Sequence, residues 1–210
     1  MQPLTANWPT ATVPSILPAT PPVVGTEGLE PLSILATDFP GLVIIEPRVF
    51  EDPRGYFMET FHHGRFAAAG LPTSFAQDNH SLSRQCVIRG LHYQIERPQG
   101  KLVRAIRGTV YDVAVDLRRS SHSFGRWFAI ELSDANRKQL YIPPGFAHGF
   151  CALTDEAEVI YKCTDLYHPT GERTIVWNDP QLAIPWPVRD PILAEKDKRG
   201  LRFANAPYFA

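Results

Sequence analysis

Two short segments of the sequence each deliver one histidine beside a glycine within an apolar run. Residues 87–94 have the sequence V-I-R-G-L-H-Y-Q and contain His92, and residues 141–150 have the sequence Y-I-P-P-G-F-A-H-G-F and contain His148. In this way a β-barrel can place a titratable ring in its mouth without filling it. Because histidine exchanges a proton near neutral pH, the two rings are candidates for proton transfer, metal binding or structural packing.

Counting the possible ligands argues against a metal centre. Metal-binding jelly rolls of the cupin type usually present two histidines one residue apart with a nearby glutamate, and a third histidine after a P-x-G turn. Residues 143–148 resemble the second half of that pattern, but Gln94 stands where a second histidine is expected. Two neutral imidazoles without a placed carboxylate make a poor zinc or iron site, since these metals take three or four protein ligands. We predict neither a metal nor another cofactor.

Charged and amide side chains occur in or beside the segments around His92. They are Arg54, Gln77, Asp78, Asn79, Arg89 and Lys101. Such groups gathered around one pocket suit an anionic ligand, particularly a diphosphate. Each of them taken singly is also explained as a solvated surface group, and Arg54 most readily so. The joint pattern is what favours a binding site.

The elements that must position these residues are short strands, which begin at about residue 41. Residues 109–118, T-V-Y-D-V-A-V-D-L-R, alternate strictly, with Tyr111 on one face and Asp112 on the other, which indicates a half-buried antiparallel strand. Similar runs occur at 42–45, 87–94, 102–106, 127–132, 139–142, 158–163 and 174–177. Helical periodicity is nearly absent outside 62–69. Many short strands with glycine and proline corners predict an all-β, double-sheet jelly roll with a few short helices.

Composition limits the classes of function. The chain has 210 residues, 44% of them hydrophobic, and a formal net charge of -1. That charge offers no electrostatic case for binding nucleic acid or a membrane surface, and apolar runs such as 41–45 are far too short for a bilayer, which needs about 20 residues. The chain has three widely spaced cysteines, Cys86, Cys151 and Cys163, and no C-x-x-C motif. They indicate neither a disulfide framework nor a zinc knuckle. We therefore expect a reducing, cytoplasmic compartment.

The start of the chain differs from the rest. Eight of the 20 prolines fall in residues 1–40, and no lysine or arginine precedes Arg48, so the basic start of a signal peptide is missing. We interpret residues 1–37 as a flexible or loosely docked Pro-rich extension, and residues 38–210 as one folded domain. A proline-rich ligand for another protein is the alternative, although no P-x-x-P array with basic flanks supports it.

An ordered set of motifs runs through the folded part. It comprises D-P-R-G-Y-F-M-E-T-F (52–61), Q-D-N-H-S (77–81), R-G-L-H-Y-Q (89–94), Q-G-K-L-V-R (99–104), F-A-H-G-F (146–150), Y-K-C-T-D-L-Y (161–167) and W-N-D-P (177–180). With A-E-K-D at 194–197, these motifs resemble the dTDP-4-dehydrorhamnose 3,5-epimerase family. The resemblance covers about residues 41–200 and leaves out the Pro-rich start. Ala194 departs from it, because the family commonly has serine there.

The resemblance implies a cofactor-free enzyme of the cupin fold that acts on a 4-keto-6-deoxy sugar attached to thymidine diphosphate. The implied reaction converts dTDP-4-dehydro-6-deoxy-D-glucose to dTDP-4-dehydro-L-rhamnose, on the route to dTDP-L-rhamnose and cell-surface polysaccharide. By the same resemblance, His92 is the base that removes a sugar proton, and Asp197 orients the imidazole ring of His92 and favours its charged form. Tyr161 returns a proton from the opposite face, and Lys101 lies beside the developing oxyanion.

The resemblance also implies substrate contacts and a homodimer. The implied substrate contacts are Arg54, Glu59, Gln77, Asp78, Asn79, Arg89, Lys101, His148, Glu172 and Lys196. Tyr167 is implied as a further wall of the nucleotide site. Arg54 and its neighbours are expected to complete the site of the partner subunit. A long strand edge near residues 41–60 gives a physical reason to pair.

The chemistry independently explains why these residue types belong together. A hydrogen next to a ketone is weakly acidic, so its removal needs a base such as His92 and a cation such as Lys101 at the enolate oxygen. Inversion needs a second proton donor across the sugar ring. On strict alternation Tyr161 shares a face with Val159 and Cys163, which aims it into the barrel. An ordinary buried tyrosine bonded to the backbone is the alternative for Tyr161.

One local conflict concerns the strand around His92. Simple alternation from Ile88 puts Arg89 on the face opposite His92, so both can contact substrate only if the strand bulges or twists. Gly90 is the obvious place for that bulge.

Three functions from different classes stay open. The first is the epimerase, and related enzymes epimerise carbon 3 alone, carbon 5 alone or both, a choice that the sequence does not decide. The second is a metal-dependent cupin enzyme. The third is a noncatalytic jelly roll that binds a sugar or a sugar nucleotide.

Overall fold

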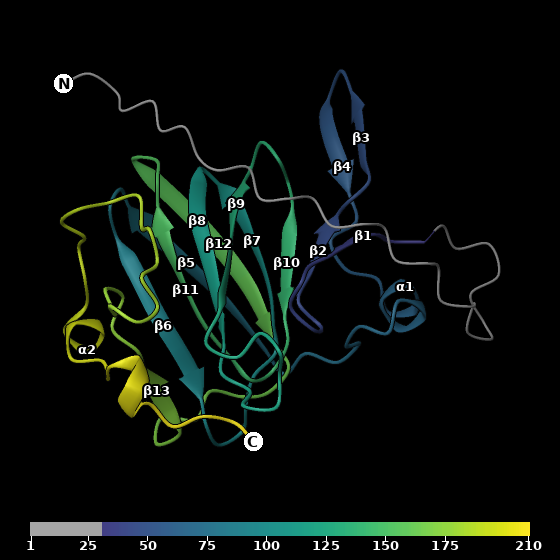
Figure 1. The fold of residues 1–210 in the computed structure, drawn as a ribbon. Coiled ribbons are helices and arrows are strands. Elements are labelled where there is room, and N and C mark those ends of the chain that lie inside the picture. Colours follow the sequence, from purple (N-terminus) through teal and green to yellow (C-terminus); the bar gives the residue numbers. More distant parts are fainter. Residues whose placement is uncertain (1–30) are drawn as a thin grey trace.

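The computed structural model describes residues 31–210 and contains two antiparallel β-sheets that face each other (Figure 1). The first sheet has the order β1 (Ser33–Ala36), β2 (Val43–Glu46), β10 (Gln139–Ile142), β7 (Lys101–Arg107), β12 (Glu156–Cys163) and β5 (Gln77–Arg84). The second has the order β13 (Glu172–Thr174), β6 (Ile88–Gln94), β11 (Phe146–Ala152), β8 (Thr109–Asp116) and β9 (Trp127–Ser133). The predicted all-β jelly roll is confirmed.

Smaller elements decorate the two sheets. They are the hairpin of β3 (Val49–Asp52) and β4 (Gly55–Met58), helix α1 (His63–Ala68), helix α2 (Glu195–Lys198) and a 3₁₀ turn (Phe203–Asn205). The hairpin projects away from the sheets, whereas α2 lies beside β6 (Figure 1). The helix expected over 62–69 is therefore present, with bounds one residue shorter at each end.

The predicted Pro-rich extension, residues 1–37, falls mostly outside the described residues. Residues 33–36 form β1, whose Ile34 pairs with Ile45 of β2. Ile34 also packs against the hydrophobic cluster beneath α1, which contains Phe66. Its apolar side chain explains why the sheet begins within residues assigned to the extension.

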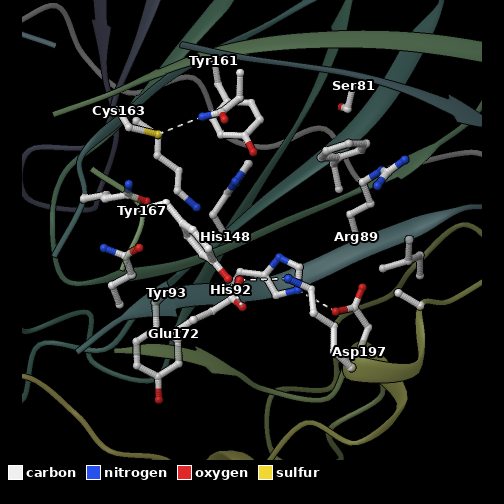
Figure 2. A pocket seen from close by; sticks show the side chains of 18 of the residues that line it. Ser81, Arg89, His92, Tyr93, His148, Tyr161, Cys163, Tyr167, Glu172 and Asp197 are labelled. Carbon is white, nitrogen blue, oxygen red and sulfur yellow. Dashed lines mark hydrogen bonds and ion pairs between the residues drawn. The ribbon is translucent and has the colours of Figure 1, made fainter. Parts of the chain in front are cut away.

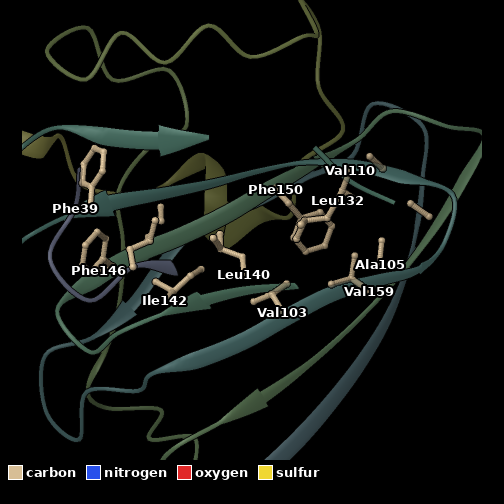
Figure 3. Close-up of a cluster of buried hydrophobic side chains, with 14 residues drawn as sticks. Phe39, Val103, Ala105, Val110, Leu132, Leu140, Ile142, Phe146, Phe150 and Val159 are labelled. Carbon is tan, nitrogen blue, oxygen red and sulfur yellow. The ribbon is translucent and has the colours of Figure 1, made fainter. Parts of the chain in front are cut away.

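The main hydrophobic core lies between the sheets (Figure 3). Strand alternation supplies it, because Val103 of β7 and Val159 of β12 point inward from the first sheet while Phe150 of β11 points inward from the second. Each is 3% exposed or less. Full burial of such a side chain stabilises the fold by roughly 1.5–3 kcal/mol. This core closes one end of the barrel and leaves the other end for polar residues.

Strand β8 is buried on both faces, which corrects the half-buried strand predicted over 109–118. Val113 and Val115 pack under a C-terminal segment that contributes Trp186 and Phe203. On its other face, Asp112 is fully buried within the barrel. The prediction was wrong because an aspartate on an alternating strand suggests solvent, whereas here the inner face packs in the core through Val110 and Ala114, and Asp112 bonds His148.

Strand β6 contains the bulge predicted at Gly90. His92 pairs with His148, and Arg89 pairs with Phe150. The stretch from Arg89 to His92 on β6 is therefore one residue longer than the stretch from His148 to Phe150 that it faces on β11. Gly90 has a φ of 130°, and a Cβ atom there would lie 2.5 Å from the Cα atom of Gly149. Two facing glycines thus permit the close approach, and the extra residue turns Arg89 to the face that His92 occupies.

Candidate active site

The two sheets enclose a cavity of about 560 Å³ at the polar end of the barrel (Figure 2). His92 and His148 line it from the second sheet, and Lys101 and Tyr161 line it from the first. His92 and His148 are direct cross-strand neighbours. The base, acid and cation suggested by the sequence therefore share one cavity.

His92 forms a hydrogen bond with the carboxylate of Asp197 in α2, with its Nε2 atom 2.6 Å from Oδ1 (Figure 2). Asp197 is only 2% exposed. An ionised carboxylate can only accept a hydrogen bond, so Nε2 carries the proton and donates it. The Nδ1 atom of the ring is then the one with a free lone pair, and the carboxylate stabilises the positive charge that forms when Nδ1 accepts a proton.

The position of α2 follows from bridges on either side of it. Before the helix, Ile192 accepts a hydrogen bond from the backbone N of Ile88 at 3.1 Å. After it, the backbone N of Leu201 donates to Thr174 at 2.8 Å. These contacts hold a helix of only four residues beside β6 and thereby bring Asp197 to His92.

His148 has a carboxylate partner that the sequence did not suggest. Its Nε2 atom lies 2.9 Å from Oδ2 of Asp112, and both side chains are buried. Burial lowers the pKa of His148 below its ordinary value against the opposing effect of Asp112. The neutral ring donates to Asp112 and offers Nδ1 as an acceptor. The sequence could have identified Asp112 as a site residue, because it is a charged residue on the inward face of an alternating strand.

Lys101 and Tyr161 lie in the same low-dielectric part of the cavity. Burial lowers the pKa of Lys101 and raises the pKa of Tyr161, because it disfavours the charged form of each group. Cys163, on the same inward face of β12 as Tyr161, accepts a hydrogen bond from Nδ2 of Asn79 at 3.5 Å. The inward direction predicted for Tyr161 is confirmed.

A polar network forms the mouth of the cavity. The Tyr167 hydroxyl donates to Oε2 of Glu172 at 3.0 Å, and Nζ of Lys196 donates to Oε1 of the same carboxylate at 2.9 Å. Burial by itself would raise the pKa of Glu172, but these bonds outweigh it and hold that pKa below its ordinary value. The Tyr167 ring, half exposed, presents an aromatic face to a ligand.

Polar residues of β5 form a further wall. Gln77, Asn79 and Ser81 alternate along the strand and all line the cavity. Gln77 donates from Nε2 to Oδ1 of Asn79 at 2.8 Å. The Ser81 hydroxyl is buried and has no hydrogen-bond partner within residues 31–210. Ser81 lies inside the Q-D-N-H-S motif, so the same alternation that indicates Asn79 could have identified it.

Arg89 enters this cavity with its guanidinium already oriented. Its Nε atom donates to the hydroxyl of Ser83 at 2.9 Å, and Nη2 donates to the carbonyl of Leu82 at 3.0 Å. A fixed guanidinium suits an anionic group such as a phosphate.

Three of the predicted substrate contacts lie outside this cavity in the single chain. Asp78 points outward from β5, as alternation requires, and bonds Lys162 at 2.9 Å. Glu59 pairs with Arg65 at 3.0 Å near α1. Arg54, at the tip of the projecting hairpin, has a side chain that is 90% exposed. The single chain therefore brings together only part of the predicted set.

Among residues 31–210, no group of three His, Cys, Asp or Glu side chains has an arrangement that could hold a metal ion. His92 and His148 each face a carboxylate instead. None of the helices in that part of the chain combines the length and apolarity needed to cross a bilayer.

Comparison with known proteins gives one consistent result. The model of the dTDP-4-dehydrorhamnose 3,5-epimerase family matches residues 36–205. An enzyme of that name from Pseudomonas aeruginosa is 55% identical over 172 residues, which cover 81% of this chain and 95% of the relative. A dTDP-4-dehydrorhamnose 3-epimerase from Streptomyces niveus is 42% identical over 168 residues, covering 79% and 81% of the two chains.

A solved structure shares the fold. It is the Legionella pneumophila dTDP-6-deoxy-D-glucose-3,5-epimerase in complex with dTDP-4-keto-L-rhamnose, with a TM-score of 0.81 and 45% identity. The match covers 84% of this chain and 95% of that one. The cupin-type form of the jelly roll expected from the sequence is thereby confirmed.

Proposed function

This chain belongs to the dTDP-4-dehydrorhamnose 3,5-epimerase family, and we propose that its cavity converts dTDP-4-dehydro-6-deoxy-D-glucose to dTDP-4-dehydro-L-rhamnose without a cofactor. The observation that carries the proposal is the shared cavity. The His92–Asp197 pair lies on the side of the second sheet, and Tyr161 lies on the side of the first sheet. A sugar ring held between them has a base on one face and an acid on the other.

Proton removal is assigned to Nδ1 of His92. Asp197 fixes the tautomer and the orientation of the ring and leaves Nδ1 as the atom that takes up the proton. As the carbon next to the ketone loses its proton, negative charge develops on the ketone oxygen. Lys101 is the cation assigned to that oxygen, and its low-dielectric surroundings strengthen the attraction. The neutral His148 is a further polar group on the same wall.

Proton return is assigned to the Tyr161 hydroxyl. A raised pKa keeps this phenol protonated, which suits an acid that waits for the enolate. Its hydroxyl delivers a proton to the face opposite the one from which His92 removed it, so the carbon inverts. Once His92 has released its proton to water and Tyr161 has regained one, the same cycle at the second carbon next to the ketone inverts that carbon as well.

The nucleotide half of the substrate is assigned to the mouth and the β5 wall. Tyr167 provides a face for the thymine ring, and Lys196, paired with Glu172, adds a positive charge near the diphosphate. Arg89 is the other phosphate ligand in this chain.

A homodimer would account for Arg54, which lies outside the cavity of its own chain. The hairpin that carries Arg54 projects from its own sheets (Figure 1). Its aromatic side chains Tyr56 and Phe57 are exposed. We propose that this hairpin reaches the cavity of a second subunit. The cytoplasmic location stays a prediction.

Proton NMR of the reaction in heavy water tests the function. With dTDP-4-keto-6-deoxyglucose as substrate, we expect deuterium to enter carbons 3 and 5 with inversion at both. Absence of any turnover or exchange would overturn the proposal. The second candidate is an epimerase of one carbon only, which the similarity to the Streptomyces niveus 3-epimerase supports. It would show inversion at carbon 3 alone.

A further inference from the structure

A loop at the cavity mouth, residues 164–171, carries Tyr167 outside any regular strand. Glutamine side chains hold its backbone at several points. Gln77 accepts from the backbone N of Tyr167 at 2.8 Å, and Gln99 donates to the carbonyl of Asp165 at 2.8 Å. Residues 165–170 have no sheet ladder to fix them, so these side-chain bonds to the backbone, together with the bond from the Tyr167 hydroxyl to Glu172, hold the aromatic ring in place.

Gln94 makes the most extensive of these contacts. Its Oε1 atom accepts from the backbone N of His168 at 2.8 Å. Its Nε2 atom donates to the carbonyl of Arg97 at 2.8 Å and to that of Leu166 at 3.3 Å. Gln94 is 4% exposed, and it thereby joins the two loops on either side of the mouth.

The residue type matters for this pattern. The amide must accept from one N–H group and donate to two carbonyl groups, a combination that neither histidine nor glutamate can provide. The three partners also fix the orientation of the amide, because the reverse orientation would set its NH₂ against an N–H group. Gln94 stands where metal-binding cupins have a histidine. In this protein its amide forms hydrogen bonds with the loop backbone instead.

We propose that Gln94 is a positioning residue, which sets the affinity for the nucleotide half of the substrate by fixing Tyr167 before the substrate arrives. The inference rests on the proposed function, since it takes dTDP as the group that Tyr167 contacts. If the loop is already ordered in the folded protein, binding does not include the entropic cost of ordering it. The affinity for the ligand is then higher without any new contact. Gln94 touches none of the atoms assigned to the proton transfers, so kcat should change little.

The variants Gln94→Leu and Gln94→Glu test this role. Leucine removes all three bonds, whereas glutamate keeps the acceptor for the His168 N–H group. With Gln94→Leu we expect the Kd for dTDP, measured by calorimetry, and the KM for the sugar nucleotide to rise about tenfold, with kcat within about twofold of wild type. Gln94→Glu sets its second oxygen against the carbonyls of Arg97 and Leu166, so it should also weaken dTDP binding. Gln85→Leu is the control, because the side chain of Gln85 bonds the carbonyl of Leu153, away from the cavity.

A double-mutant cycle with Tyr167→Ala separates positioning from general damage. If Gln94 acts through Tyr167, the double variant should bind dTDP no more weakly than Tyr167→Ala alone. Additive losses, or a fall in kcat with unchanged dTDP affinity, would overturn the inference. If Gln94→Leu does not fold by circular dichroism, unchanged affinity in Gln94→Glu overturns it equally. Wild-type protein that fails to bind dTDP would instead remove the proposed function and this inference together.

Discussion

The Nε2 atom of His92 lies 2.6 Å from the Oδ1 atom of Asp197, although 105 residues separate the two in the chain. One residue comes from a sheet strand and the other from a four-residue helix clamped beside it. The carboxylate is buried, so it acts on the imidazole with little screening by water. This pair gives the ring a fixed orientation and a defined basic nitrogen, and the first prediction concerns it.

Replacement of His92 by asparagine should abolish both epimerisation and solvent exchange. Asparagine cannot take up the sugar proton, and loss of a general base typically costs about 10²–10⁴-fold in rate. Deuterium incorporation followed by NMR is the measurement. His122→Asn serves as the matched control, since His122 is exposed and contacts a backbone carbonyl. Exchange at the wild-type rate in His92→Asn would exclude His92 as the base.

Replacement of Tyr161 by phenylalanine should separate exchange from inversion. His92 can still remove a proton and return deuterium to the same face, whereas no hydroxyl remains on the opposite face. We therefore expect deuterium at the sugar carbons with the original configuration retained. Tyr141→Phe, at a buried tyrosine on the outer side of the first sheet, is the control. Normal inversion in Tyr161→Phe would assign the acid role elsewhere.

The alkaline side of the pH–rate profile should report Lys101. Its pKa is lowered by burial, so the cation is lost at a lower pH than an ordinary lysine, while the raised pKa of Tyr161 keeps that phenol protonated to higher pH. Lys101→Arg keeps its charge throughout, and its alkaline limb of kcat should move to higher pH. Lys138→Arg, remote from the cavity, should leave the limb in place. An unmoved limb in Lys101→Arg would contradict this assignment.

Mixed dimers can test whether the hairpin acts across subunits. Arg54→Ala and His92→Asn should each be nearly inactive alone. Co-refolding them in equal amounts makes half of the dimers mixed, and each mixed dimer has one intact site, so about a quarter of wild-type activity should return. Sedimentation of the wild-type protein should show a dimer. No recovery of activity on mixing would mean that Arg54 does not complete the partner's site.

Stability at low pH should depend on Asp116. This buried carboxylate accepts from Arg118 at 2.7 Å and from the Ser123 hydroxyl at 2.7 Å. Burial opposes its ionisation, but these bonds prevail and lower its pKa to about 2. A lowered folded-state pKa stabilises the fold above the ordinary value near 4, and the contribution is lost as pH falls toward 2.

Asp116→Asn should therefore destabilise the protein by about 2 kcal/mol at pH 7 and by progressively less below pH 4. Urea unfolding at fixed protein concentration measures the difference. The control is Asp190→Asn, at an exposed position. A difference between wild type and Asp116→Asn that stays constant down to pH 2 would show that the ion pair is not its cause.

Periodicity predicted some of these elements well. Alternation placed Tyr161 on the inward face of its strand, and the conflict between Arg89 and His92 located the bulge at Gly90. Strand β10 has the predicted bounds, Gln139–Ile142. These features depend on local backbone geometry, which neighbouring residues determine directly.

Strand β5 shows where periodicity fails. Its inward residues Gln77, Asn79 and Ser81 are as polar as its outward residues, because they line the cavity and not the hydrophobic core. An apolar alternation is therefore absent from a strand that is fully part of the sheet. The functional wall of the barrel was for this reason the least visible part of its fold.

The sequence by itself determined the residue types of the site, the all-β class and the family, since these depend on composition, spacing and ordered motifs. Tertiary structure alone decided the pairings: Asp112 with His148, and Gln94 with the loop of Tyr167. It also put Arg54 outside the cavity of its own chain. Such contacts join segments far apart in sequence, and only the packing of two sheets with their connecting loops fixes the distance between them.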